Sequence, residues 1–266
     1  MMKVPYGISN FDMMSLENYY YVDKTPFLEK LENLSTKYHT FLRPRRFGKS
    51  LWISVLEYYY GYEYRHKFQA LFGKFYIGQN PTPRANSFFV LSFEFSRIDT
   101  ATPESTYKGF LTNVKTAARR FVKNYKEFLG TTTIEEINKI DSPEAVLKYV
   151  LESVELNTDK KIYILIDEYD HFANELLSFH AEEFEKMVSR SGWVRKFYET
   201  IKTGTQTGVV GSFFITGVSP ITLDSMTSGF NISCSLTVDV EFHNLMGFDR
   251  STVFDIVKRL RASQFY

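Results

Sequence analysis

The segment Thr40–Leu51 limits the fold more strongly than any other part of the chain. It joins an apolar approach to a helix-compatible run through the triplet Gly48, Lys49 and Ser50. A strand, a loop and a helix in this order place backbone N–H groups and a helix N-terminus around an anion. In a P-loop, the lysine reaches the β- and γ-phosphates and the serine hydroxyl binds Mg²⁺. We therefore expect Lys49 and Ser50 to take these roles.

The match to the full pattern G-x-x-x-x-G-K-[ST] is partial. The first glycine would stand at position 43, where the chain has Arg43. A Gly-Lys-Ser triplet is common by chance, and the alternative is a helix start with an exposed lysine. If the loop binds a nucleotide, the contacts come from Pro44, Arg45, Arg46, Phe47, Gly48, Lys49, Ser50 and Leu51.

The second feature is an apolar run that ends in carboxylates. Ile162–Ile166 leads directly into Asp167 and Glu168. Such a run is typical of a strand that is buried on both faces of a parallel sheet. Its C-terminal end lies where α/β folds bind ligands. We expect Asp167 to hold Mg²⁺ and Glu168 to act as general base on the attacking water. The alternative is a strand that ends in a solvated acidic turn.

Composition narrows the class of protein. The chain has 266 residues, of which 44% are hydrophobic and 24% charged, as in ordinary globular domains. The net charge of +1 gives no bulk electrostatic reason for binding nucleic acid or membranes. The lone cysteine, Cys234, excludes an internal disulfide, and we expect it to be buried. No apolar run reaches the roughly 18 residues of a transmembrane helix, and the first residues lack a signal-peptide core. We expect a cytoplasmic protein.

Periodicity and turn signals predict the remaining elements. The predicted strands are Ser87–Phe95, Val209–Val218 and Ser235–Phe242, and the predicted helices are 26–34, 103–129, 143–156, 171–188, 193–202 and 248–261.

Four segments together resemble a known family. Tyr20–Thr25, Arg43–Ser50, Asp167–Asp170 and Thr216–Pro220 are similar to the AAA-ATPase-like family of bacterial proteins, over residues 4–250. Its members resemble P-loop ATPases of the additional-strand type, often with a nuclease-like PD-(D/E)xK domain at the C-terminus. Arginine at the first glycine position is usual there, so Arg43 does not count against nucleotide binding. It leaves the efficiency of hydrolysis open, because the loop lacks that glycine's freedom.

The resemblance implies a three-layer α/β/α fold with a mostly parallel sheet and the strand Ser87–Phe95 at its edge. It implies a lead-in, residues 1–39, that packs on an ATPase-like domain, residues 40–266. We expect this chain to be a fragment that lacks a C-terminal domain. In the lead-in, Tyr21 or Phe11 could stack on adenine, and a purely structural role is the alternative.

The resemblance also implies ATP and Mg²⁺ as cofactors and ATP hydrolysis as the reaction. Lys49 and Glu168 would be catalytic, and Thr216 would sense the γ-phosphate, with Ser219 or a simple turn as alternatives. Arg190 and Arg195 are candidate arginine fingers. The competing hypothesis is an ATP-binding switch or scaffold that scarcely turns over and regulates an appended or partner domain. Self-association and a partner protein are both compatible with this, while nucleic acid enters by family association alone.

Overall fold

The computed structural model describes residues 3–179, 181–189, 191–220 and 231–263. Within this part of the chain, five parallel strands form one sheet in the order β2-β3-β4-β1-β5. The strands are β1 Tyr38–Leu42, β2 Phe89–Glu94, β3 Ile162–Asp167, β4 Val210–Gly217 and β5 Cys234–Ser235. Because β4 lies between β1 and β3, the sheet has the additional-strand order, with β2 at the edge as predicted.

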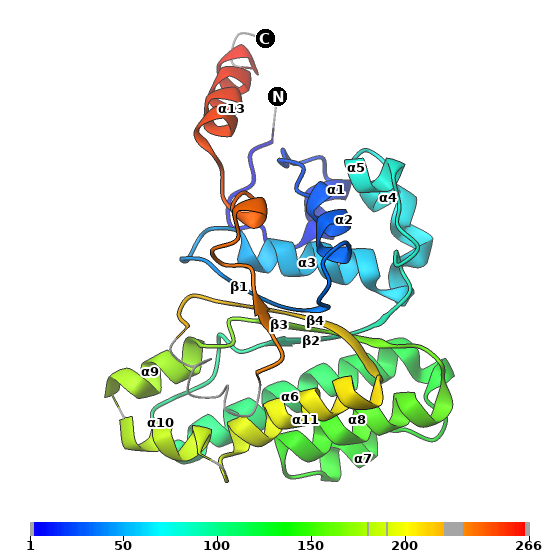
Figure 1. Ribbon diagram of the computed structural model, residues 1–266, viewed down its shortest axis with the longest axis vertical. Helices are drawn as coiled ribbons and strands as arrows, with labels where there is room; N and C mark the ends of the chain where they lie inside the picture. The colour runs from blue at the N-terminus through cyan, green and yellow to red at the C-terminus, as the bar shows by residue number, and fades with distance from the viewer. Residues whose placement is uncertain (1–2, 180, 190, 221–230, 264–266) are drawn as a thin grey trace.

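Helices cover both faces of the sheet, which gives the three layers seen in Figure 1. One layer contains α1 Phe11–Leu16, α2 Pro26–Glu32, α3 Lys49–Tyr60, the 3₁₀ helix η1 Tyr62–Lys67, α4 Phe68–Phe72 and α5 Tyr76–Gln79. The other contains α6 Pro103–Tyr125, η2 Lys126–Phe128, α7 Ile134–Lys139, α8 Pro143–Asn157, α9 His171–Phe179, α10 Ala181–Val188 and α11 Trp193–Thr207. The predicted α/β/α fold class is confirmed.

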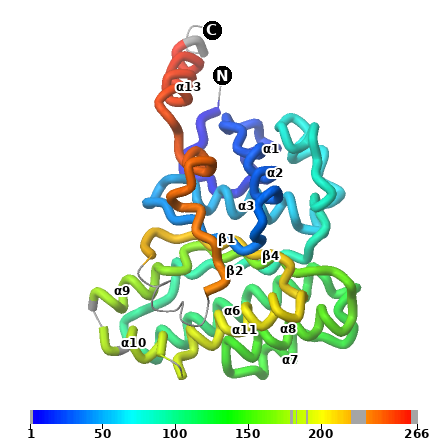
Figure 2. The backbone as a smooth tube through the Cα atoms, viewed as in Figure 1, coloured from blue at the N-terminus to red at the C-terminus, as the bar shows by residue number. Residues whose placement is uncertain are grey.

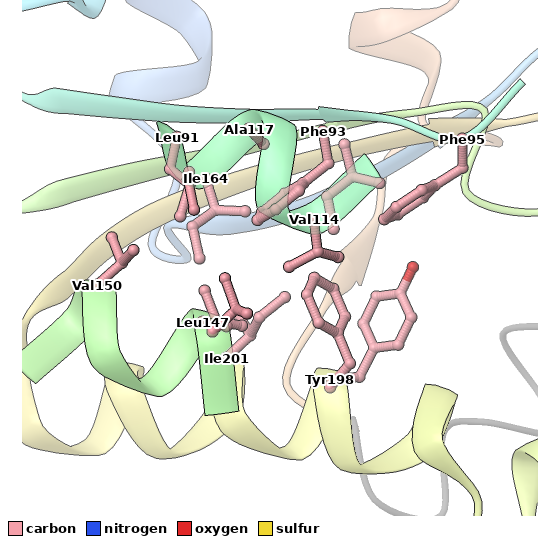
Figure 3. Packing of buried hydrophobic residues seen from close by; sticks show 14 of the residues in the cluster. Leu91, Phe93, Phe95, Val114, Ala117, Leu147, Val150, Ile164, Tyr198 and Ile201 are labelled. Carbon is pink, nitrogen blue, oxygen red and sulfur yellow. The ribbon is translucent and has the colours of Figure 1, made fainter. Parts of the chain in front are cut away.

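Two apolar clusters hold the layers together. In the first, alternate residues of β2 pack against α6, α8 and α11, and Figure 3 shows Leu91, Phe93 and Phe95 facing Val114 and Leu147. In the second, the opposite face of the sheet packs on α1, α2 and α3. β3 is buried along its whole length, which accounts for its unbroken apolar sequence. Truncating its buried Leu165 to alanine would destabilise the fold by about 2–5 kcal/mol.

Local signals explain where the long helices begin. Thr102 caps α6 in a reciprocal capping box with Ser105, and Pro103 occupies the first turn. α8 likewise carries Pro143 in its first turn, as predicted. α3 differs, because Gly48 precedes it and provides no side-chain cap. The N-terminus of α3 therefore leaves its first N–H groups open to a ligand.

Three sequence-based predictions about local structure were wrong. The strand predicted over Ser235–Phe242 is limited to Cys234–Ser235, and the chain then turns into the 3₁₀ helix η3, Val240–Phe242. Val238 and Val240 are exposed, so the apolar alternation there does not reflect burial. Cys234 is exposed because β5 lies at the sheet edge. The single helix predicted over 171–188 is two helices, α9 and α10.

The first described residues and the last helix lie on the same side of the molecule (Figure 2). The last helix, α13 Arg250–Ser263, stands away from the body and exposes Phe254 and Val257. Its Arg259 guanidinium approaches the Tyr20 ring. Among the described helices, none combines the length and apolar character needed to cross a membrane.

Candidate nucleotide-binding site

The loop between β1 and α3 is shaped by two residues in the left-handed region. Arg46 has φ +69° and Gly48 has φ +92°. Glycine takes this conformation without strain, whereas arginine does so at some cost in free energy. Together the two residues turn the chain so that α3 begins at Lys49 without a side-chain cap. The resulting helix N-terminus, with its partial positive charge, suits a phosphate group.

Arg43 does not need the freedom of the glycine it replaces. It is not among the non-glycine residues with positive φ, and its N–H donates to the Gly217 carbonyl at 3.1 Å. Its guanidinium lies 4.2 Å from the Phe41 ring and donates to the carbonyl oxygens of Leu42 and Thr237. The side chain therefore fastens the segment after β5 to β1 and leaves the loop interior clear.

Lys49 lies inside the loop and is only 5% exposed. Its Nζ donates to the carbonyl oxygens of Arg43 at 3.1 Å and Pro44 at 3.2 Å. Burial lowers the pKa of Lys49, and the charges of Asp167 and Glu168 act in the opposite direction. The ammonium group therefore faces the acidic end of β3, and one of its three N–H donors is not committed to these two carbonyls.

Asp167 brings together residues from three elements. It ends β3 and is 5% exposed, and its Oδ1 accepts a hydrogen bond from Thr216 Oγ1 at 2.9 Å. Burial raises the pKa of Asp167, while hydrogen bonds from Ser50 and Thr216 and the charge of Lys49 lower it. The Ser50 hydroxyl and the Asp167 carboxylate are oxygen ligands of the kind that Mg²⁺ prefers.

The acidic end of β3 suits Mg²⁺ better than a metal ion whose ligands all come from the protein. Within the described ranges, no group of three or more His, Cys, Asp or Glu side chains could hold an ion. Mg²⁺ needs no such cage, because it binds through one or two protein oxygens and fills its shell with water and substrate phosphate. Ser50 and Asp167, the two ligands expected from the sequence, offer such oxygens, and magnesium binding by them stays a prediction.

Glu168 projects from a strained backbone at the tip of β3. Its φ is +51°, and the next residue, Tyr169, is fully buried and donates its N–H to the Thr216 carbonyl at 3.1 Å. Burial and the neighbouring Asp167 raise the pKa of Glu168, while His171 and Lys49 lower it. A carboxylate with a raised pKa is a better proton acceptor, which suits a general base.

Asp170 has a structural function that sequence reasoning did not assign. It is 1% exposed, and its Oδ2 accepts hydrogen bonds from the backbone N–H groups of Val218 at 2.9 Å and Ser219 at 2.6 Å. The same oxygen accepts from Asn174 Nδ2 at 2.9 Å. Asp170 thus ties the turn after β4 to α9. No local pattern predicts this role, because the two N–H groups of the turn lie nearly fifty positions away along the chain.

An apolar cavity of about 220 Å³ adjoins the start of α3. Its lining includes Tyr21, Phe47, Leu51, Trp52 and Phe248. Trp52 is 3% exposed, and among the described residues its Nε1–H has no hydrogen-bond partner. The cavity therefore offers an apolar wall and one orphaned buried donor.

Of the two lead-in aromatics, only Tyr21 lies at this cavity. Phe11 is fully buried against Phe72 and Phe75. Of the two candidate arginine fingers, Arg195 donates to Glu199 on its own helix, α11, at 2.9 Å. Arg190 lies outside the described residues.

Glu94 was given no role from the sequence and lies close to the site. It ends β2 and is the register partner of Asp167. Its negative charge contributes to the raised pKa of both Asp167 and Glu168. The missed signal is its position at the carboxyl end of a parallel strand, where ligand-contacting residues gather.

A comparison with protein-family models agrees with this geometry. The model described as "Predicted AAA-ATPase" matches residues 5–227, most of the chain. The chain belongs to this AAA-ATPase-like family. The resemblance inferred from the sequence is thereby confirmed, and the parallel sheet with β4 between β1 and β3 agrees with it.

This AAA-ATPase-like chain is also similar to a curated protein from Azotobacter chroococcum mcd 1, "Uncharacterized protein in vnfD 5'region". The two are 27% identical over 256 residues, which cover 94% of this chain and 44% of the relative. The chain thus spans less than half the length of that relative. No solved structure is significantly similar to it.

Proposed function

We propose that this chain binds ATP with Mg²⁺ and hydrolyses it to ADP and phosphate. The observation that carries the proposal is the convergence of Lys49, Ser50 and Asp167 at the same end of the sheet. Lys49 and Ser50 open α3, while Asp167 ends β3, and the two segments are separated in the sheet by β4. A cation, an uncapped helix N-terminus and two oxygen ligands together match a metal-bound triphosphate.

In this proposal the loop holds the phosphates through its backbone and Lys49. The N–H groups from Arg46 to Leu51 lie at the uncapped start of α3, and Lys49 adds a fixed positive charge. Arg45 and Arg46 are exposed and brace the outer phosphate oxygens. Ser50 and Asp167 would hold Mg²⁺, which when bound supplies charge neutralisation to the phosphates.

Glu168 would prepare the water. Its carboxylate accepts the proton as the water oxygen bonds to the γ-phosphorus, and the bond from that phosphorus to the β–γ bridging oxygen breaks to release ADP. Thr216 supports this step by holding Asp167, since its hydroxyl already donates to that carboxylate. Sensing of the γ-phosphate by Thr216 stays a prediction, because it requires the hydroxyl to change partner.

The apolar cavity is our candidate for the base. It begins at Gly48 and Leu51, next to the phosphate loop, and has flat aromatic walls in Tyr21 and Phe47. The unpartnered Trp52 Nε1–H would donate to a ring nitrogen, which removes the penalty of a buried, unsatisfied donor. In this proposal Phe47 therefore contacts the base of the nucleotide and not its phosphates.

Calorimetry and phosphate release test the proposal. We expect Mg²⁺ with a non-hydrolysable ATP analogue to bind the wild type and Glu168→Gln equally, and Lys49→Ala at least about tenfold more weakly. Glu168→Gln should lower phosphate release by about 10²-fold or more. Absence of any heat with the wild type would refute nucleotide binding altogether.

A second candidate is a nucleotide-dependent switch with little turnover. It is favoured by the bonds of Lys49 to the Arg43 and Pro44 carbonyls, because phosphate binding would have to replace them and move the loop. Intact binding with equal, negligible phosphate release from the wild type and Glu168→Gln would support the switch.

The setting of this activity is part of the proposal. We place it in the cytoplasm, where a lone exposed thiol such as Cys234 remains reduced. Because the chain covers 44% of a longer relative, we propose that the ATPase cycle drives or regulates a further domain, a partner protein or a second copy.

A further inference from the structure

The outer edge of β2 and the helix α6 form a groove. β2 is the outermost strand, and α6 lies in the helix layer beneath it (Figure 1). The groove holds a cavity of about 460 Å³, and its lining includes Ser92, Glu94, Arg97, Lys108 and Arg120. We call it the β2–α6 groove. It is separate from the apolar cavity beside α3, with which it shares no lining residue.

The backbone of β2 offers hydrogen-bonding groups to this groove. The Phe89 N–H donates inward to the Lys161 carbonyl, whereas the Val90 N–H donates outward to Tyr125 Oη at 2.8 Å. Because a parallel strand alternates in this way, the N–H and C=O groups of Ser92 and Glu94 also point outward. The start of this edge is already covered, because the Tyr62 N–H donates to the Phe88 carbonyl at 2.8 Å and Tyr125 accepts from Val90. Within the described part of the chain, the outward groups of Ser92 and Glu94 have no such cover. An uncapped strand edge is a template for another extended chain.

The rim of the groove is cationic. Arg97 is exposed and forms no ion pair with any described residue. Lys108 is 75% exposed in its side chain and reaches Glu104 only at 3.5 Å. Glu94 is the single acidic residue in the lining. The free positive charge of Arg97 and the weakly held charge of Lys108 complement acidic side chains on a ligand.

A peptide fits these features better than a nucleic acid. The net charge of the chain is only +1, and the third cation of the groove, Arg120, is bound to Glu57 at 3.2 Å. Farther along α6, Lys115 is also engaged, with the Asn138 carbonyl at 2.9 Å. Nucleic-acid binding depends on many free cations along a phosphate backbone. Donors and acceptors at strand spacing are instead what a peptide backbone pairs with.

We propose that the β2–α6 groove binds an extended, acidic peptide segment of a partner protein, which adds a strand to the sheet beside β2. Its backbone would pair with Ser92 and Glu94, and its carboxylates would pair with Arg97 and Lys108. Since Glu94 is the register partner of Asp167, such a segment would end beside Glu94, one strand away from the acidic tip of β3. The proposal holds whether or not the chain hydrolyses ATP.

Selection from a random peptide phage library tests the proposal. The library is panned on the full chain after depletion on Ser92→Pro, which removes the outward N–H of Ser92. Proline is tolerated on edge strands, so the fold should survive, and a thermal melt checks it. A selected peptide, labelled with fluorescein, is then titrated against the wild type, Ser92→Pro, Arg97→Glu and the control Lys123→Glu. Lys123 is an exposed lysine of α6 that does not line the groove.

We expect the selected peptides to carry Asp or Glu at alternate positions. Their Kd should rise at least about tenfold with Ser92→Pro and with Arg97→Glu, and change less than about twofold with Lys123→Glu. If Ser92→Pro fails to fold, Arg97→Glu and Lys123→Glu decide the question alone. The proposal is overturned if no peptide is enriched, or if binding is indifferent to Arg97→Glu. It is also overturned if fluorescein-labelled oligo-dT binds more tightly than the peptides and depends on Arg97.

Discussion

The hydrogen bond from Thr216 to Asp167 should stabilise the fold, and this effect can be tested without any nucleotide. Both side chains are buried, and the bond is 2.9 Å long. Replacing Thr216 with valine keeps the shape and removes the donor. A hydrogen bond to a charged group contributes about 1.5–3 kcal/mol, so Thr216→Val should lose about that much stability. For a chain of this size the melting temperature should fall by about 3–12 °C.

Thr106 provides a matched control. It is also fully buried, and its Oγ1 donates at 2.9 Å, but the acceptor is the neutral Thr102 carbonyl. Thr106→Val should therefore cost only about 0.5–1.5 kcal/mol, and this cost should not vary with pH. Comparing the two variants separates the effect of the acceptor's charge on stability from the effect of losing a buried hydroxyl.

The pH dependence gives the sharper test. Burial raises the pKa of Asp167 above its ordinary value of 3.8, so the folded state holds the proton more tightly than the unfolded state. Stability is therefore lost as pH rises from that value through the folded pKa. The Thr216 bond lowers the folded pKa, and removing it enlarges the loss.

Melting curves from about pH 4, near the ordinary pKa of an aspartate, up to about pH 8 measure this effect. The difference between Thr216→Val and the wild type should grow toward the higher pH, while that of Thr106→Val should stay constant. If the two variants shift the melting temperature by amounts within about 1 °C of each other at every pH, the assigned role of Thr216 is wrong.

Four further predictions each concern a single residue. Asp170→Ala removes the buried carboxylate that accepts from the N–H groups of Val218 and Ser219 and should lose about 3–5 kcal/mol in urea unfolding, with Asp170→Asn losing less; equal midpoints would contradict this. Gly217→Ala would drive its Cβ into the Tyr169 ring and should cost about 1–3 kcal/mol, measured by the same unfolding. Glu168→Gly relieves a positive φ and should gain about 1 kcal/mol while phosphate release disappears, so an unchanged or lower stability would argue against strain. Cys234 is exposed, so a thiol reagent should label it completely in the folded protein, and protection until unfolding would show it to be buried.

The sequence predicted those parts of the site that depend on local order along the chain. Gly48 had to precede a helix, and an apolar strand had to end at Asp167, so both motifs could be assigned to their elements directly. That the two motifs lie close together was predicted from the resemblance, which supplied the strand order. The structure then placed Ser50 in hydrogen-bonding range of Asp167, as the pattern required.

The parts that could not be predicted depend on contacts between distant segments. The Arg43 guanidinium reaches the Thr237 carbonyl, 194 positions away, and nothing near either residue indicates this bond. The apolar alternation after Ser235 resembled a strand, but in this register β1 ends at Leu42, opposite Thr237, and offers no partner to the residues beyond. Periodicity in the sequence indicates which residues could face the core of a sheet. The length of the neighbouring strand determines how many of them actually join the sheet.

Because β4 lies between β3 and β1, its alignment with these two strands determines how the residues of the site are placed. A slip of one residue would displace Thr216 by about 3.3 Å and turn its hydroxyl to the opposite face of the sheet. The irregular pairing between β3 and β4 occurs at Ile162 and Tyr163, at the far end from Asp167. The irregularity between the two strands therefore lies where no ligand is expected, and a one-residue insertion in β4 beyond that point should disrupt the site.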